Sequence, residues 1–131
     1  MSCLESLVGG RDMNKGSMRA LSVVAPSGQL IASGKKTIEV RRWLPDLSPE
    51  EDLLIVENLN YLRKDGDEEP GIAVAVVNIS PVHPFTPDDI PAACASGFEE
   101  GWFAWEISNV RQVDPAINAR AARKIYIIEW D

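Results

Sequence analysis

The chain has few of the residues that build metal sites or disulfide frameworks, with a single histidine, His83, and two cysteines, Cys3 and Cys94. A structural zinc site needs about four ligands, and neither cysteine is close to His83 in the sequence. We therefore expect no metal site and no cofactor. A Cys94–His83 nucleophile pair would lack an orienting third group, and Cys94 is expected to be a small core residue. Cys3 falls in an expected tail and Cys94 in a helical segment, so reduced thiols are expected.

Long apolar runs are also missing from the sequence. No stretch approaches the ~20 residues that a membrane helix needs, and the N-terminus lacks the basic start and apolar run of a signal peptide. With 45% hydrophobic and 25% charged residues, the composition is that of one globular domain. We expect a cytoplasmic protein without a membrane partner, in which residues 1–17 form a flexible extension and 18–131 a single domain.

Negative charge is concentrated in one segment of the chain. Residues 46–69 carry nine acids and two bases, Arg63 and Lys64. The net charge of this segment is therefore −7, the same as that of the whole chain. The window 34–43 instead holds four bases and one acid. Coating nucleic acid non-specifically needs many phosphate contacts, so this distribution argues against that mode. It still permits binding of a nucleoside, a nucleotide or a short single-stranded segment.

The most informative window, residues 34–43, reads as a polar strand. Strand periodicity places Thr37, Glu39 and Arg41 on one face. A hydroxyl, a carboxylate and a guanidinium spaced by roughly 6.5–7 Å suit a site that holds a small polar ligand at several points. The alternative is an ordinary amphipathic strand with a surface ion pair worth at most about 1 kcal/mol.

Two short helices are predicted on either side of this strand. Pro26 can begin a helix in its first turn, and Gly34 can end it in the left-handed conformation, which brings Lys35 and Lys36 out at the mouth of the site. The second helix is predicted to begin after Thr86, a capping residue that a proline and two acids follow.

Aromatic residues are concentrated near the same regions. Trp43 follows the basic pair at 41–42 and is the candidate for stacking on a base, since single-stranded bases are commonly bound in this way. Core packing is the alternative for any tryptophan. Trp102 and Trp105 would face opposite ways on a regular strand, so one of them is expected in the core.

Together these segments resemble the signature of the ASCH domain family, a PUA-like group of proteins. The resemblance comes from the pattern Leu21-Ser22, a short helix, then Gly34-x-Lys36-Thr37-x-Glu39-x-Arg41 and Trp43. A second region, residues 101–111 with the closing run 124–129, is similar to the last strands of the family. The resemblance implies an α+β fold, a small, mostly antiparallel PUA-like β-barrel with two short helices.

The resemblance also implies a function that involves nucleic acid. ASCH domains are thought to bind RNA or nucleosides beside the signature motif, which here gives the candidate ligand-binding residues Lys35, Lys36, Thr37, Glu39, Arg41 and Trp43. Some members are amidohydrolases that act on N4-acetylcytidine, and others have been reported as ribonucleases. In the amidohydrolases the lysine that matches Lys36 is catalytic, assisted by a threonine where this chain has Glu39.

Three hypotheses therefore stand, of which binding of RNA, a single-stranded segment or a nucleoside is the first. The second is a hydrolase for a modified pyrimidine nucleoside, with Lys36 and Glu39 as catalytic residues. In that case Glu39 would act as general base toward water, and Lys36 or Arg41 would stabilise the oxyanion. The third is a protein-interaction module that uses the acidic segment 46–69.

Overall fold

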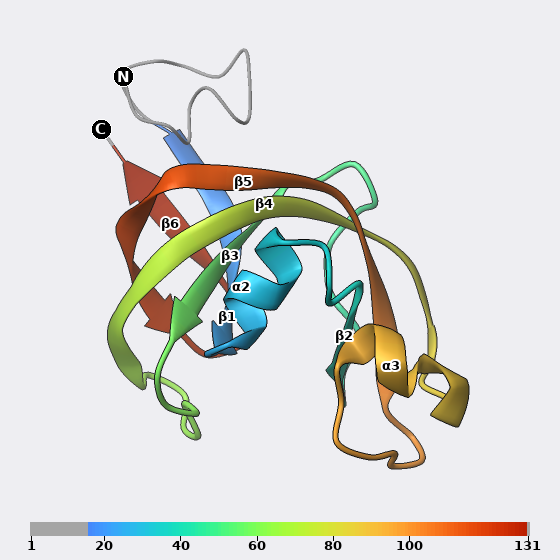
Figure 1. Ribbon diagram of the computed structural model, residues 1–131. Helices are drawn as coiled ribbons and strands as arrows, with labels where there is room; N and C mark the ends of the chain where they lie inside the picture. Colours follow the sequence, from blue (N-terminus) through green and yellow to red (C-terminus); the bar gives the residue numbers. More distant parts are fainter. Residues whose placement is uncertain (1–15, 131) are drawn as a thin grey trace.

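The computed structural model describes residues 16–130, which form a six-stranded sheet and two short α-helices (Figure 1). The strand order is β2-β5-β4-β3-β1-β6. In chain order the elements are β1 (Gly16–Val24), α2 (Ser27–Ala32), β2 (Ile38–Arg41), β3 (Leu53–Asn58), β4 (Glu68–Pro84), the 3₁₀ turn η1 (Pro87–Asp89), α3 (Ile90–Ala93), β5 (Phe103–Ala122) and β6 (Ile125–Trp130). The predicted extension, residues 1–17, lies outside the described residues as far as position 15.

The sheet is mixed and open, so the expectation of a mostly antiparallel barrel is wrong. β1 and β3 run parallel, with Leu21 opposite Ile55, because the chain between them crosses over through α2 and β2. A parallel pair requires such a long crossover. The sheet also ends in two edge strands, β2 and β6, and no ladder joins them. The two predicted short helices are present as α2 and α3.

β4 and β5 form the longest pair of strands and give the sheet its curvature. They pair from Glu68 opposite Ala122 to Pro84 opposite Phe103, with three shifts of register between those ends. Such irregularities bend strands and increase their twist. As a result the pair arches over α2 (Figure 1), and its far end carries β2.

The core lies on both faces of β3, as the continuous apolar run at 53–56 predicts. Leu53 and Ile55 belong to a cluster that includes Ile31 of α2. The alternate residues Leu54 and Val56 belong to a second cluster on the other face. Burial of such side chains contributes about 1.5–3 kcal/mol each, so α2 is anchored by its apolar side.

Local sequence signals set the limits of the two helices. Pro26 occupies the position before α2, and Gly34 ends its exit turn with a φ of 81°. Before η1, the Asp89 carboxylate accepts hydrogen bonds from the backbone N–H of Thr86 at 2.9 Å and from its hydroxyl at 3.1 Å. Within the described part of the chain, no helix is long and apolar enough to cross a membrane.

Candidate functional site

β2 presents an ion pair on one face and apolar side chains on the other. Ile38 is buried with Phe85, Ala93 and Ala104 in a small cluster that fixes the strand against α3. On the opposite face, Nε and Nη2 of Arg41 both lie 2.7 Å from Oε2 of Glu39. The predicted alternation therefore holds for Glu39 and Arg41, while Thr37 lies just before the strand begins.

Lys36 joins the same group from the turn between α2 and β2. Its ammonium donates a hydrogen bond to the carbonyl oxygen of Ala93 at 2.6 Å and lies 3.3 Å from Oε1 of Glu39. The side chains of Lys36 and Glu39 are each only 9% exposed. Because both partners of Lys36 accept hydrogen bonds, the lysine acts in this arrangement as a fixed donor. We call Lys36, Glu39 and Arg41 the charged triad.

Arg41 also connects the triad to β1. Its Nη2 donates to the carbonyl oxygen of Ser22 at 3.0 Å. The hydroxyl of Ser22 lies 2.9 Å from that of Tyr126 and accepts a hydrogen bond from the N–H of Ala122 at 3.1 Å. Burial raises the pKa of Tyr126, against the opposing effect of its hydrogen bond with Ser22. Ser22, which accepts the hydrogen bond from Arg41, is thus held in place by contacts with β5 and β6.

The triad places one carboxylate between two cations where little water reaches. Burying charges carries a desolvation cost that the ion pairs offset only with good geometry, and within residues 16–130 no buried side-chain nitrogen or oxygen lacks a partner. Arg41 is the most accessible member, with its side chain 23% exposed. Its Nη1 makes no hydrogen bond within these residues and can donate to a ligand.

The other predicted ligand-binding residues lie around the triad in different environments. Lys35 and Thr37 are exposed, and the backbone of Thr37 bonds to Ala92 at 2.8 Å. Trp43 is half-buried and packs edge-to-face on the fully buried Trp105, with ring centroids 4.9 Å apart. Trp105 is therefore the expected core tryptophan, and a stacking role for Trp43 stays a prediction.

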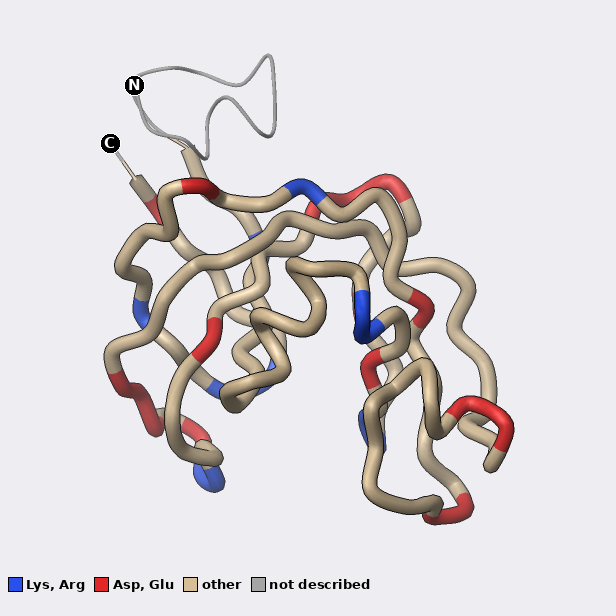
Figure 2. Tube along the Cα trace, in the orientation of Figure 1, with Lys and Arg blue, Asp and Glu red and all other residues tan. Residues whose placement is uncertain are grey.

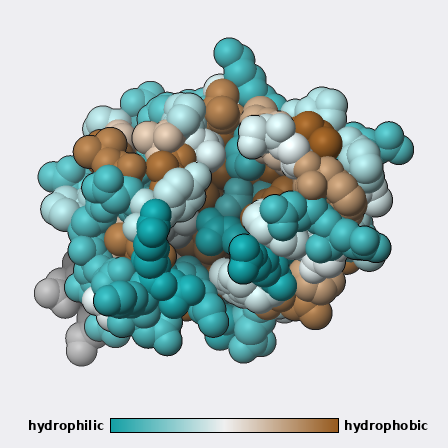
Figure 3. Space-filling model, turned by 90° about the horizontal axis from the view of Figure 1, so that it is seen from below, coloured by the Kyte–Doolittle hydropathy of each residue, from teal (hydrophilic) through white to brown (hydrophobic). Residues whose placement is uncertain are grey.

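One face of the molecule is hollowed near its middle, and hydrophilic residues line much of the hollow (Figure 3). Comparison with Figure 1 places it between α2 and the part that contains β2 and α3. The hydrogen bond from Arg41 of β2 to Ser22 joins this part to β1, the strand that precedes α2.

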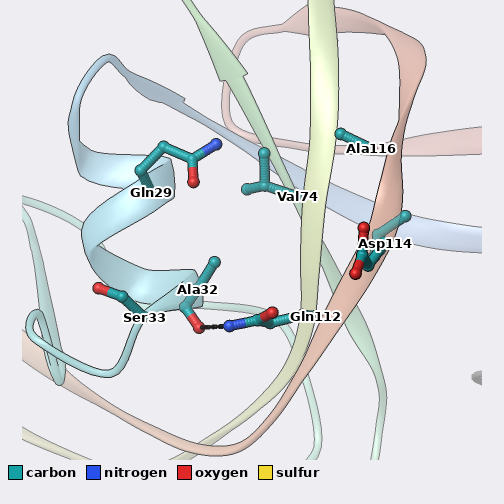
Figure 4. Close-up of a pocket in the computed structure, with 8 residues that line it drawn as sticks. Gln29, Ala32, Ser33, Val74, Gln112, Asp114 and Ala116 are labelled. Carbon is teal, nitrogen blue, oxygen red and sulfur yellow. Dashed lines mark hydrogen bonds between the residues drawn. The ribbon is translucent and has the colours of Figure 1, made fainter.

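A cavity of about 280 Å³ lies between α2, β4 and β5. Figure 4 shows Gln112 pointing toward α2, where its Nε2 donates to the carbonyl oxygen of Ala32 at 2.9 Å. Gln29, Ser33 and Asp114 add amide, hydroxyl and carboxylate groups to the lining. These residues are isolated polar side chains that form no motif, so the sequence alone does not single them out.

Few other groups in the described chain suggest chemistry. No cluster of three potential metal ligands occurs among residues 16–130. Nε2 of His83 contacts Oε2 of Glu106 at 2.9 Å, whereas Cys94 follows α3 and its sulfur lies near the carbonyl oxygen of Lys35. The conceivable Cys94–His83 pair is therefore not formed. Cys94 is exposed, so the expectation of a small core residue is wrong.

Comparisons with known proteins identify the family. The ASCH domain family model matches residues 21–117, most of the chain, and the chain therefore belongs to the ASCH domain family. This family has a PUA-like fold, and membership is consistent with RNA binding. No curated protein matches the chain.

Solved structures of ZmASCH from Zymomonas mobilis are similar in fold. A serine-to-alanine mutant of that protein is 17% identical, with a TM-score of 0.53 over 76% of this chain and 72% of the other. A tyrosine-to-phenylalanine mutant is 16% identical, with a TM-score of 0.48 over 73% and 74%. At these identities the first likeness concerns the fold alone.

Proposed function

We propose that this ASCH domain binds a nucleoside or a short single-stranded RNA segment at the charged triad. The observation that carries the proposal is the geometry of Arg41, whose guanidinium is oriented by Glu39 and by the Ser22 carbonyl while Nη1 stays available. A donor held in place before binding loses little conformational entropy when the ligand arrives.

The groups around the triad match the chemistry of a base and a phosphate. Arg41 can donate to a carbonyl oxygen or a phosphate, and guanidinium groups suit both. The exposed side chains of Lys35 and Thr37 add a cation and a hydroxyl beside it.

A hydrolase that acts on a modified pyrimidine nucleoside is the second candidate. The observation that favours it is the 3.3 Å contact of the Lys36 ammonium with the Glu39 carboxylate. A carboxylate beside cations can act as general base while a cation stabilises the developing oxyanion. In this function Glu39 would activate a water and Arg41 would meet the oxyanion.

A two-dimensional NMR titration tests the proposal directly. A panel of nucleosides that includes N4-acetylcytidine, followed by short single-stranded RNAs, is expected to shift the amides of residues 35–43 and the indole of Trp43. Ligand peaks that change with time would establish the hydrolase. Binding without shifts in this window would place the site elsewhere.

The matched variants are Arg41→Gln and Arg63→Gln, which each remove one guanidinium. Arg63 is exposed in the loop between β3 and β4 and is no member of the triad. We expect Arg41→Gln to weaken nucleoside binding by about ten-fold or more, since a hydrogen bond to a charged group contributes about 1.5–3 kcal/mol. Arg63→Gln is expected to leave nucleoside affinity unchanged, and equal effects of the two would reject the site.

A further inference from the structure

The loop between β3 and β4 displays two large hydrophobic side chains to solvent. Leu59 is 77% exposed and Tyr61 is 75% exposed, the two highest values for large hydrophobic residues in the described chain. An exposed aromatic ring gains nothing from core packing, and exposed apolar groups in one place often mark a binding surface. The exposed side chains of Leu59 and Tyr61 therefore indicate a binding surface that is separate from the charged triad.

The backbone of this loop is held by its own hydrogen bonds. Oδ2 of Asp67 accepts from the N–H groups of Arg63 at 3.1 Å and of Lys64 at 3.0 Å. The amide of Asn58 donates to the carbonyl oxygen of Asn60 at 2.7 Å. Tyr61 thus projects from an ordered turn, which lowers the entropy lost when a ligand packs on its ring.

The acids of the loop are occupied by contacts within the protein. Asp65 pairs with Arg123 of the β5–β6 turn at 2.9 Å, and Glu68 pairs with Arg120 at the same distance. By contrast, the side chains of Arg63, Lys64 and Lys124 form no ion pair within residues 16–130, and all three residues are exposed. The cations at the tip of this region are therefore available to a ligand, beside the carboxylate of Asp65, whose side chain is 89% exposed.

These cations lie toward the same side of the molecule as the triad strand. Figure 2 shows basic segments of the β3–β4 loop and of β2 both toward the lower side. Figure 3 views that side and shows the hollow near its middle. A chain bound at the hollow and extended to one side would meet the loop.

We propose that Tyr61, Lys64 and Lys124 form a second contact surface for single-stranded RNA, with Tyr61 stacked on a base and the two lysines against phosphates. Aromatic platforms flanked by cations are the usual means of binding single strands. The inference rests on the proposed function, because it assigns to the same RNA a path beyond the triad. It also predicts that a lone nucleoside does not reach this surface.

Fluorescence anisotropy with labelled oligouridines of three, six, ten and fifteen nucleotides tests the inference. Tyr61→Leu is expected to weaken the longest RNA by about ten-fold, because stacking on an aromatic ring is lost, while Tyr61→Phe retains the affinity. The double variant Lys64→Ala/Lys124→Ala should lower the salt slope of log K by about 1.4, or about 0.7 for each phosphate contact. Ile127→Ala, which shortens another exposed hydrophobic side chain, is the control and should change nothing.

The length series separates this inference from the proposed function. If long RNA depends on Arg41 but not on Tyr61 or the lysines, the second surface is rejected and the triad site stands. If long RNA depends on Tyr61 and the lysines but not on Arg41, the second surface stands and the triad site is rejected. Absence of RNA binding at every length would overturn the second surface and the RNA part of the proposed function, whereas the NMR titration decides nucleoside binding at the triad.

Discussion

Nη2 of Arg41 on β2 lies 3.0 Å from the carbonyl oxygen of Ser22 on β1, although three strands separate β2 from β1 in the sheet. The curvature of β4 and β5 returns the edge strand β2 toward β1 without a backbone ladder between them. A side chain makes the connection instead. This contact therefore couples the shape of the sheet to the orientation of the candidate binding residue.

Replacement of Arg41 should reduce stability as well as binding. We expect Arg41→Gln to lower the free energy of unfolding by about 2 kcal/mol, because a hydrogen bond to a charged group and the contact with Ser22 are lost together. Arg41→Lys keeps the charge but loses the planar fork, so it should also be less stable than the wild type. Urea denaturation measures both, and an unchanged midpoint for both variants would contradict the coupling.

Glu39 should matter more to the fold than Lys36. Glu39→Gln removes the anion that Lys36 and Arg41 share, and an unpaired buried charge costs about 3–5 kcal/mol. Lys36→Met leaves the Glu39–Arg41 pair intact and should cost less. Urea denaturation of both variants gives the order, and the double variant reports the coupling between the two positions. A larger loss for Lys36→Met would show that its bond to Ala93 dominates.

The ion pair between His83 and Glu106 should make stability depend on pH. The pKa of His83 is raised above 6.5, chiefly by its hydrogen bond with the Pro84 carbonyl and also by Glu106, against a lowering by burial. A raised pKa in the folded state means that the contribution is complete below pH 6.5 and is lost as the pH rises through the folded value. The difference in stability between wild type and His83→Gln should therefore be larger at pH 5.5 than at pH 8.

The same pair can be followed by NMR at the His83 ring. Its titration midpoint should lie above 6.5 in the wild type and fall in Glu106→Gln, which removes one of the causes. A midpoint at or below 6.5 in the wild type would contradict the contacts described for this ring.

Tyr126 should lose its proton only above pH 10, and the free energy of unfolding should fall as the pH rises through its raised pKa. Burial raises its pKa above 10, so its contribution is complete below pH 10 and is lost as the pH rises through the folded value. Absorbance titration of the Tyr61→Phe variant isolates Tyr126 and should give a midpoint above 10. Ser22→Ala removes a hydrogen bond that lowers this pKa, so it should move the midpoint further up, and a downward shift would be evidence against the Ser22–Tyr126 contact.

Local features of the fold are predictable from the sequence because they depend on neighbouring residues. Gly34 ends the turn after α2 with a positive φ, and Thr86 and Asp89 form the expected cap. The alternation of Glu39 and Arg41 on one face of β2 follows from strand geometry. Each of these depends on positions fewer than five residues apart.

The remaining features depend on contacts between distant parts of the chain. The carbonyl oxygen of Ala93, which accepts the hydrogen bond from Lys36, belongs to a helix 57 residues further along the chain. No sequence pattern in either segment predicts this contact. The parallel pairing of β1 with β3 follows from where the crossover packs. Likewise, Gln112 reaches α2 only because β5 bends over it. These are properties of tertiary packing, and the predicted barrel was wrong for the same reason.

The position of β2 within the crossover affects the order in which the protein can be completed during synthesis. Its ladder partner is the first part of β5, where Ile38 pairs with Glu106. β1 and β3 can pair earlier, since the segments they need emerge first, but β2 has no strand to join until β5 has left the ribosome. The strand that carries Glu39 and Arg41 is thus among the last to dock, and a chain that stops before β5 has the signature residues without a docked β2.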